Sequence, residues 1–282
     1  MRNAAATGTA IHTDMLFMRA YTTAARPSKI HPAPKAALKR PSEFGIAVMI
    51  TFACFGPIWA AEPPPDLAKR VAHRETITAE ARNQYAYTQS VQLQELGERG
   101  QQTGEYRESR EVIFSPVGER AERFSARPVS NLKNLVMTPE DFDDIRSIQP
   151  FVLTEDQLRI YATEYKGEEP VDGRDCWVLS IKPRQILSGQ RLFEGLLWIA
   201  EEDFSVVRSE GRAVPQIVTG KQENLFPRFT TVYKNVSGFW LPALTVADDT
   251  LYFRAGPIRE KLTIRYDDYK KFGSDTIITF DR

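Results

Sequence analysis

The residue types that most often carry out catalysis are scarce after the first 61 residues of this chain. There, the only histidine is His73 and the only cysteine is Cys176. A cysteine nucleophile needs a positioned base, and a zinc or similar site needs several imidazole, thiolate or carboxylate ligands. Cys176 stands beside Trp177 in an apolar run. We therefore expect an inert, buried thiol, no catalytic triad and no metal site.

The acidic pairs predict structure more readily than chemistry. Glu140-Asp141 follows Thr138-Pro139, where acids favour a helix start, and Glu201-Glu202-Asp203 reads as a solvated turn. Asp267-Asp268 interrupts a strand near its end. None of these pairs has the flanking residues of a glycosidase or a cation site. Because the chain also has no glycine-rich phosphate loop and no nucleophile elbow, we expect no enzyme and no cofactor.

Short apolar runs separated by turn signals dominate the second half of the chain. Their residues are β-branched and aromatic, and Asp-Gly, Pro and acidic clusters stand between them. The runs are Cys176–Pro183, Gly195–Ala200, Phe204–Arg208 and Phe229–Tyr233, followed by the corner Gly238–Pro242. This pattern predicts an antiparallel meander.

The remaining elements follow the same rules. Helical spacing predicts a helix within Pro64–Gln84 with Asp66 as its cap, and Thr138-Pro139 starts a second helix that Pro150 ends. The segment around Thr154–Leu158 is either a further helical turn or the start of a strand. Further strands are predicted over Tyr85–Leu93, Thr103–Phe114, Glu119–Ala126, Leu225–Val236, Leu241–Phe253, Arg259–Lys270 and Thr276–Phe280.

Several of these strands alternate between apolar and other residues. Trp177, Leu179 and Ile181 share one face of their strand, and Leu262, Ile264 and Tyr266 share one face of another. Strands with one apolar face predict a curved sheet that wraps around an interior. The interior is filled either by helices and the sheet's own side chains or by an acyl chain or lipid.

The order of turn and packing residues over the second half resembles the outer-membrane lipoprotein carrier (LolA-like) superfamily, in particular its uncharacterised branch. The residues that carry the resemblance are Tyr161, Tyr165-Lys166-Gly167, Asp172-Gly173-Arg174, Cys176, Val178-Leu179, Ile181, Pro183, Leu197-Trp198-Ile199, Val206-Val207-Arg208, Val236, Gly238 and Trp240-Leu241-Pro242. The resemblance implies an α+β fold: a curved, incomplete antiparallel β-barrel of roughly ten strands, with helices closing its concave face. It also implies an apolar cavity under those helices.

The function implied by this resemblance is binding or carrying an apolar ligand in the periplasm, such as a lipid or the acyl chains of a lipoprotein. The expected cavity wall consists of Trp177, Leu179, Ile181, Leu197, Ile199, Val207, Leu262, Ile264 and Tyr266. Expected partners are a lipid or an acylated lipoprotein, with transient membrane contact. The alternative is an envelope sensor or interaction module that uses the same fold to bind a protein or membrane partner.

The first 61 residues predict an export segment rather than part of the domain. Met1–Arg40 carries seven basic residues, and residues 44–61 have no charge and end in Ala60-Ala61 before a proline run. A cleaved signal is favoured, but an uncleaved anchor and a lipidated Cys54 remain as alternatives. All three place residues 62–282 outside the cytoplasm as one domain.

The charge of the predicted domain argues against nucleic acid as a partner. The chain has 37 basic and 37 acidic residues, and residues 1–61 hold seven and two of them. The domain therefore has 30 basic against 35 acidic residues and a net charge of −5. It has no basic stripe, and its single cysteine excludes an internal disulfide.

Overall fold

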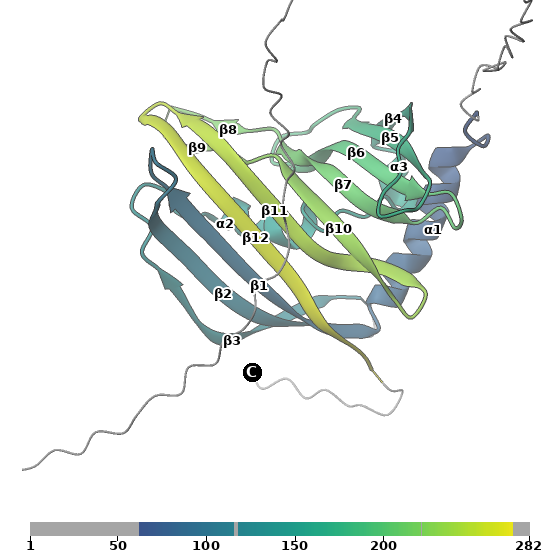
Figure 1. The fold of residues 1–282 in the computed structure, drawn as a ribbon, viewed down its shortest axis with the longest axis horizontal. Coiled ribbons are helices and arrows are strands. Elements are labelled where there is room, and N and C mark those ends of the chain that lie inside the picture. The colour runs from purple at the N-terminus through teal and green to yellow at the C-terminus, as the bar shows by residue number, and fades with distance from the viewer. Residues whose placement is uncertain (1–61, 116–117, 221, 273–282) are drawn as a thin grey trace, which may run out of the picture. The chain divides into compact units, whose positions relative to one another are not determined.

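A single antiparallel sheet of ten strands dominates the computed structural model, which describes residues 62–115, 118–220 and 222–272. Its strand order is β3-β2-β1-β12-β11-β10-β7-β6-β5-β4 (Figure 1). The strands are β1 Tyr85–Leu96, β2 Gln102–Phe114, β3 Arg120–Ser130, β4 Tyr161–Glu168, β5 Cys176–Pro183, β6 Leu192–Ala200, β7 Val206–Val214, β10 Phe229–Val236, β11 Phe239–Phe253 and β12 Gly256–Lys271. A separate short pair joins β8 Ile217–Val218 to β9 Glu223–Asn224.

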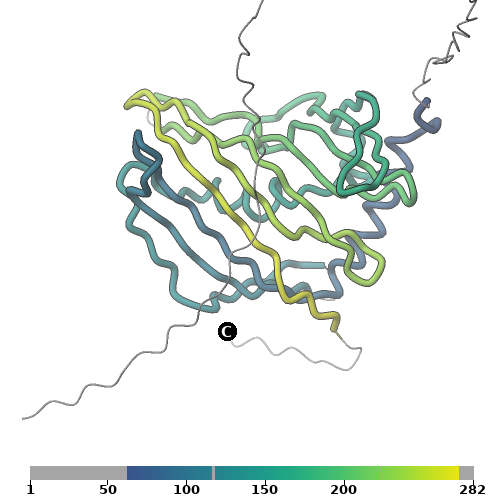
Figure 2. The backbone as a smooth tube through the Cα atoms, viewed as in Figure 1, coloured from purple at the N-terminus to yellow at the C-terminus, as the bar shows by residue number. Residues whose placement is uncertain are grey.

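The predicted meander is present, and a long-range pair joins it to the first strands. β1 pairs with β12 over most of its length, so that Val91 lies opposite Ile264 and Leu93 opposite Leu262. The tube trace shows the early and late parts of the chain side by side at this junction (Figure 2). The sheet is thus one open, curved surface, since β3 and β4 end the strand order without pairing to each other.

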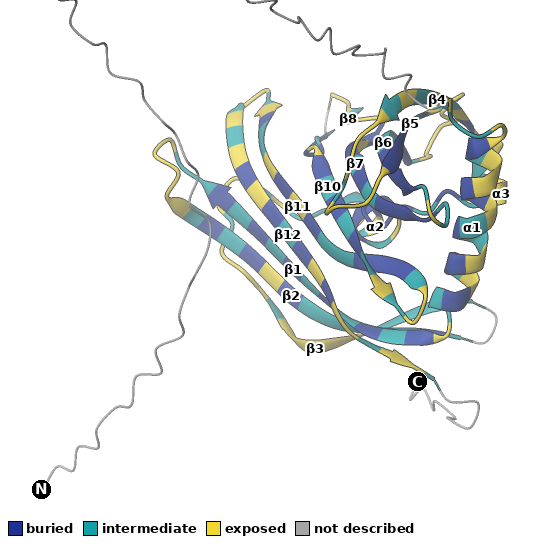
Figure 3. Cartoon of the chain, turned by 45° about the vertical axis from the view of Figure 1, so that its right-hand side comes forward, coloured by how far each residue is buried: buried dark blue, intermediate teal, exposed yellow. Residues whose placement is uncertain are grey.

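Alternating burial shows which face of the sheet carries the core. Every second residue of β1, from Tyr85 to Glu95, is buried, and so are Glu260, Leu262, Ile264 and Tyr266 of β12 (Figure 3). Because directly opposite residues of antiparallel strands share a face, these two rows form one buried surface. The predicted alternation of β1 and β12 is confirmed.

The prediction that β5 has only one apolar face is wrong. Cys176, Trp177, Val178 and Leu179 are all buried, so both faces of β5 are covered at its start. On one face Trp177 stacks on Phe204, with ring centroids 5.3 Å apart. A strand buried on both sides reads as a continuous apolar run, which is what this segment shows.

Helix α1, Leu67–Arg82, matches the first predicted helix, but its predicted cap is wrong. Asp66 adopts a left-handed conformation with φ 61° and makes no side-chain capping bond. Its carboxylate instead lies 2.9 Å from Lys69 Nζ. In the middle of α1, the buried Glu75 carboxylate accepts from the Val206 backbone N–H at 3.2 Å. This bond connects α1 to β7.

Helix α2, Pro139–Ser147, begins as predicted. Thr138 Oγ1 accepts from the Asp141 backbone N–H, and the Asp141 carboxylate accepts from the Thr138 backbone N–H at 2.7 Å. This reciprocal capping box satisfies two donors that the first helical turn leaves free. A short helix α3, Glu155–Leu158, settles the second segment as a helical turn.

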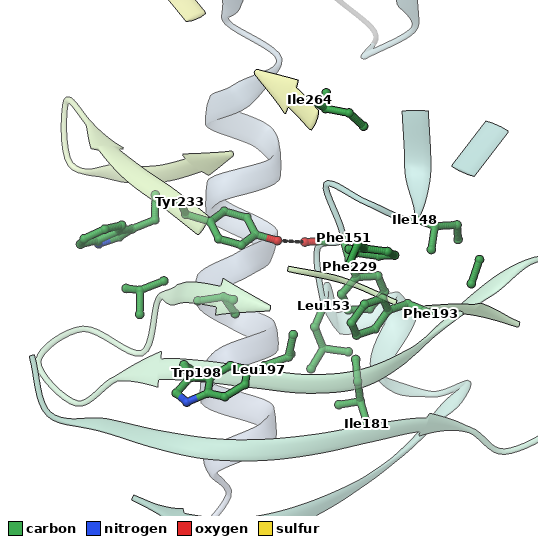
Figure 4. Close-up of a cluster of buried hydrophobic side chains, with 14 of the residues drawn as sticks. Ile148, Phe151, Leu153, Ile181, Phe193, Leu197, Trp198, Phe229, Tyr233 and Ile264 are labelled. Carbon is green, nitrogen blue, oxygen red and sulfur yellow. Dashed lines mark hydrogen bonds between the residues drawn. The ribbon is translucent and has the colours of Figure 1, made fainter. Parts of the chain in front are cut away.

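The segment after α2 crosses the buried face of the sheet and is held there by side chains of the strands. Tyr233 donates to the Phe151 carbonyl at 2.9 Å, the bond drawn in Figure 4, and Thr231 donates to the Gln149 carbonyl at 2.8 Å. Phe151 also stacks on Phe193, with ring centroids 4.8 Å apart. The chain therefore fills this half of the sheet with its own side chains.

The two segments at the ends of the chain are not part of this description. The predicted export segment, residues 1–61, and the predicted strand Thr276–Phe280 lie outside the described residues. In the part of the chain that is described, no helix has the length and apolar character needed to cross a membrane.

Candidate ligand pocket

A cavity of about 340 Å³ lies beside the packed half of the buried face. Its floor comes from β1, β11 and β12, and its walls come from residues 134–149 and from residues 223–227. The lining is mostly apolar and includes Leu93, Leu135, Met137, Ile145, Leu225, Phe226, Leu251, Phe253, Ile258 and Leu262. Cavities that hold small ligands have volumes of roughly 300–1,000 Å³ and this kind of lining.

A buried carboxylate positions one wall of the pocket. Glu95, at the end of β1, is 1% exposed and accepts from the backbone N–H groups of Lys133, Asn134 and Leu135. Three backbone donors satisfy an ionised carboxylate well and hold the chain that makes them in one conformation. The wall beside Leu135 is thus fixed to the sheet by Glu95.

The start of α2 forms the polar side of the pocket. Asp141 and Asp144 both line it, and burial raises the pKa of each carboxyl group. Arg191 makes a two-point contact with Asp144 and donates to the Pro215 carbonyl at 2.7 Å. The Arg191 guanidinium lies 3.4 Å from the centroid of the Phe226 ring. The Arg191 guanidinium therefore already has its partners within the protein, beside the pocket.

Glu260 is the least satisfied carboxyl group of the pocket. It is 4% exposed and has no hydrogen-bond or ion-pair partner among the described residues. Its direct neighbours across the sheet are Glu95 on β1 and Asp249 on β11. Burial, followed by the charges of Asp141 and Asp249, raises the pKa of Glu260 to about 8. At neutral pH its side chain is mostly protonated.

Two amide oxygens of the lining also have no partner. Gln149 Oε1 and Asn224 Oδ1 are buried, and neither receives a hydrogen bond within the described chain. The amide nitrogen of Asn224 is used, since it donates to Thr138 Oγ1. Buried polar atoms normally have partners, but both oxygens are shielded from the cavity as well as from solvent, so Glu260 is the group without a partner that faces it.

Of the nine residues predicted for the cavity wall, the structure places one at the pocket and eight away from it. Leu262 lines the pocket. The other eight belong to the packed core: Trp177, Leu179, Ile181, Leu197, Ile199, Val207, Ile264 and Tyr266. Across β5 and β6, Leu179 lies opposite Leu197 and Trp177 lies opposite Ile199, and Trp177 stacks on Phe204. Their role in binding a ligand stays a prediction.

Cys176 and His73 occupy separate environments. Cys176 is fully buried, and its thiol donates to the Arg174 carbonyl at 3.5 Å. Burial is the main cause that raises the pKa of this thiol, which favours the unreactive protonated form. His73 lies on the exposed side of α1, with Nδ1 2.9 Å from Glu155 Oε1. Among the described residues, no group of His, Cys, Asp or Glu could hold a metal ion.

Apart from Leu262, the pocket residues were not predicted, although the sequence contains one signal for them. Glu95 and Glu260 occupy inward positions of β1 and β12, in step with the buried residues of each strand. A charged residue at an inward position of an otherwise apolar face is a marker of a site, because burying it is costly. The wall residues from Asn134 to Gln149 carry no such signal.

The comparisons with known proteins concern the fold. No family model and no curated protein matches the chain. Among solved structures, a DUF1329 family protein from Desulfovibrio piger has a TM-score of 0.42 at 14% identity, covering 76% of this chain and 96% of that one. A LolA superfamily protein from Nitrosomonas europaea has a TM-score of 0.31 at 14% identity, covering 71% and 94%.

The LolA superfamily, which the sequence resembles, is named among these structures. A further similar structure is the complex of MucA and MucB from Pseudomonas aeruginosa, with a TM-score of 0.21 at 14% identity, covering 71% of this chain and 94% of the matched chain. At these identities and TM-scores, no ligand and no role follows from the similarity.

Proposed function

We propose that this protein is an exported binding or carrier protein for an apolar ligand and that it has no catalytic role. The observation that carries the proposal is the cavity of about 340 Å³, whose lining is mostly aliphatic and aromatic. In this proposal, α2 and the segment after it close the concave side of the incomplete barrel over the ligand. A lipid or the acyl chain of a lipoprotein has the chemistry that such a lining accepts.

The proposed site differs from the wall expected from the sequence. The ligand lies against Leu251, Ile258 and Leu262 rather than against the packed residues of β5 and β6. Each methylene group that moves from water into the cavity contributes about 0.8 kcal/mol. Affinity should therefore rise with chain length until the cavity is full.

The test is a competition experiment with a fluorescent apolar probe and a series of straight-chain alcohols on delipidated protein. The proposal expects saturable, stoichiometric probe binding and displacement that strengthens with each added methylene up to a limit. Absence of saturable binding would exclude the carrier function. The competing class, an envelope sensor or interaction module, predicts instead that the protein purified from its own envelope retains a protein partner and no lipid.

A further inference from the structure

One polar group in the wall of the pocket faces the cavity without a partner. Glu260 has no hydrogen-bond or ion-pair partner among the described residues, whereas Asp141, Asp144 and Glu223 each have one. The apolar lining explains an acyl chain but leaves the Glu260 carboxyl group without a role. A ligand that fits the whole pocket must therefore bring a partner for it.

The ionisable side chains that line the pocket are all carboxyl groups. Asp141, Asp144, Glu223 and Glu260 line the cavity, and no lysine, arginine or histidine is among the lining residues. Arg191 stands behind the wall and is held by Asp144. The field inside the pocket thus favours a cation and opposes an anion such as a fatty-acid carboxylate.

Three of the four carboxylates already have partners, which leaves Glu260 as the position for the cation. Asp141 accepts from Thr138, and Glu223 accepts from the Arg254 backbone N–H at 3.0 Å. The chain neighbours of Glu260, Arg259 and Lys261, are exposed on the opposite face of β12. No cation of the described chain lies against the Glu260 carboxyl group.

We propose that the pocket is selective for an apolar molecule that carries a protonated amine, with the ammonium group bound at the Glu260 carboxyl group. This inference rests on the proposed function and names its ligand class. An ammonium group has three donors and no acceptor, which suits a carboxyl group that has no other partner. A single-chain alkylamine and a lipid with an amine headgroup share this chemistry.

The environment of Glu260 gives the binding a specific dependence on pH. The groups that face it are Glu95 on β1, Asp249 on β11, and Asp141 and Asp144 on α2, with Arg191 paired to Asp144. The pKa of Glu260 is about 8 in the unoccupied pocket, and an adjacent ammonium favours its ionised form. Binding below pH 8 must therefore release close to one proton, so affinity should rise about tenfold per pH unit up to that point.

The experiment compares dodecylamine, dodecanol and dodecanoic acid as competitors of the apolar probe on purified, delipidated protein. We expect dodecylamine to bind at least tenfold more tightly than dodecanol at pH 8.5 and dodecanoic acid to bind most weakly. The preference for the amine should decrease about tenfold between pH 7.5 and 6.5, whereas dodecanol binding should stay constant. A lysolipid with an ethanolamine headgroup, tested beside dodecylamine, shows which source of the amine fits better.

Two variants separate this inference from the proposed function. Glu260→Gln keeps the size of the side chain and should equalise the amine and the alcohol while dodecanol still binds. Asp248→Asn removes the same charge from the exposed face, where Asp248 pairs with Arg259 at 3.0 Å, and should keep the preference. If all three compounds bind wild-type protein equally, the amine site is wrong and the carrier function stands. If none binds, both are wrong.

Discussion

Glu95 and Glu260 are direct partners across β1 and β12, but only Glu95 receives hydrogen bonds. The two carboxyl groups share a buried face, one satisfied by three backbone N–H groups and the other facing the cavity. The surroundings of Glu260 raise its pKa to about 8, with burial as the largest cause. The first prediction concerns the effect of this raised pKa on stability.

Glu260→Gln should stabilise the protein at high pH. The pKa of Glu260 is about 8 in the folded protein against an ordinary value of 4.5. The folded state therefore holds the proton more tightly, and its stability falls as the pH rises from 4.5 through 8. Glutamine does not titrate and avoids this loss. We expect the variant to gain about 1–3 kcal/mol at pH 8.5 and to equal wild type near pH 4.

Urea unfolding at the two pH values measures this difference. Glu75 and Asp144 also titrate at raised pKa values, but they do so in both proteins and cancel in the comparison. A variant that differs from wild type by the same free energy at both pH values would contradict the assignment of Glu260.

Ile258→Trp should fill the pocket without disturbing the packed core. Ile258 is half-buried, lies opposite Leu251 and lines the cavity. We expect most of the stability to remain while the affinity for an apolar probe falls at least tenfold. Leu179→Trp is the matched control in the packed half, where Leu179 is 3% exposed. Overpacking there should cost about 1–3 kcal/mol. Equal effects of the two variants on thermal stability would exclude a real cavity.

Tyr233→Phe should loosen the segment that crosses the buried face. The Tyr233 hydroxyl donates to the buried Phe151 carbonyl, and removing the donor leaves that oxygen unsatisfied. The expected cost is about 1–3 kcal/mol in the free energy of unfolding. Tyr252→Phe, at a side chain that is 77% exposed, is the control and should be neutral. Denaturant midpoints of both variants give the comparison.

Cys176→Ser should change stability and nothing else. The buried thiol makes one long contact with the Arg174 carbonyl, and serine adds a hydroxyl group to an apolar site. We expect a loss of roughly 1–2 kcal/mol and unchanged ligand binding. A folded variant without its cellular activity would show that the thiol has a chemical role.

The mature protein should begin near Glu62, because residues 44–61 carry no charge and end in Ala60-Ala61 before three prolines. Intact-mass measurement on protein recovered from the envelope decides between the alternatives. A mass that includes residues 44–61 indicates an anchor, and an added diacylglycerol group at Cys54 indicates a lipoprotein.

Local signals in the sequence predicted the elements that depend on neighbouring residues. The capping box of α2 needs only Thr138 and Asp141, and the alternation of β1 and β12 can be read from one strand at a time. The cap of α1 was predicted wrongly because Asp66 has a competing partner, Lys69, one turn further along. Its carboxylate takes the ion pair rather than the backbone donors.

The pocket depends on contacts between distant parts of the chain, and the sequence does not show them. The Glu95 carboxylate accepts from the Lys133 backbone N–H, and the Tyr233 hydroxyl donates to the Phe151 carbonyl. These contacts hold the segments before and after α2 against the buried face, next to the cavity. Apolar residues of β5 and of β12 look alike in the sequence, so the expected wall could not be divided into packed and lining residues beforehand.

Among the described residues, the outer strands β3 and β4 each pair on one side only, which has a consequence for association between copies of the chain. β3 contains Arg120, Glu122, Arg123 and Arg127-Pro128, and β4 contains Glu164, Lys166 and Glu168. A second chain that added its strand to either edge would have to desolvate these charges, and Pro128 offers no N–H for the new ladder. An open sheet with an apolar interior can thus remain dispersed at high concentration, because its exposed borders are poor templates for strand addition.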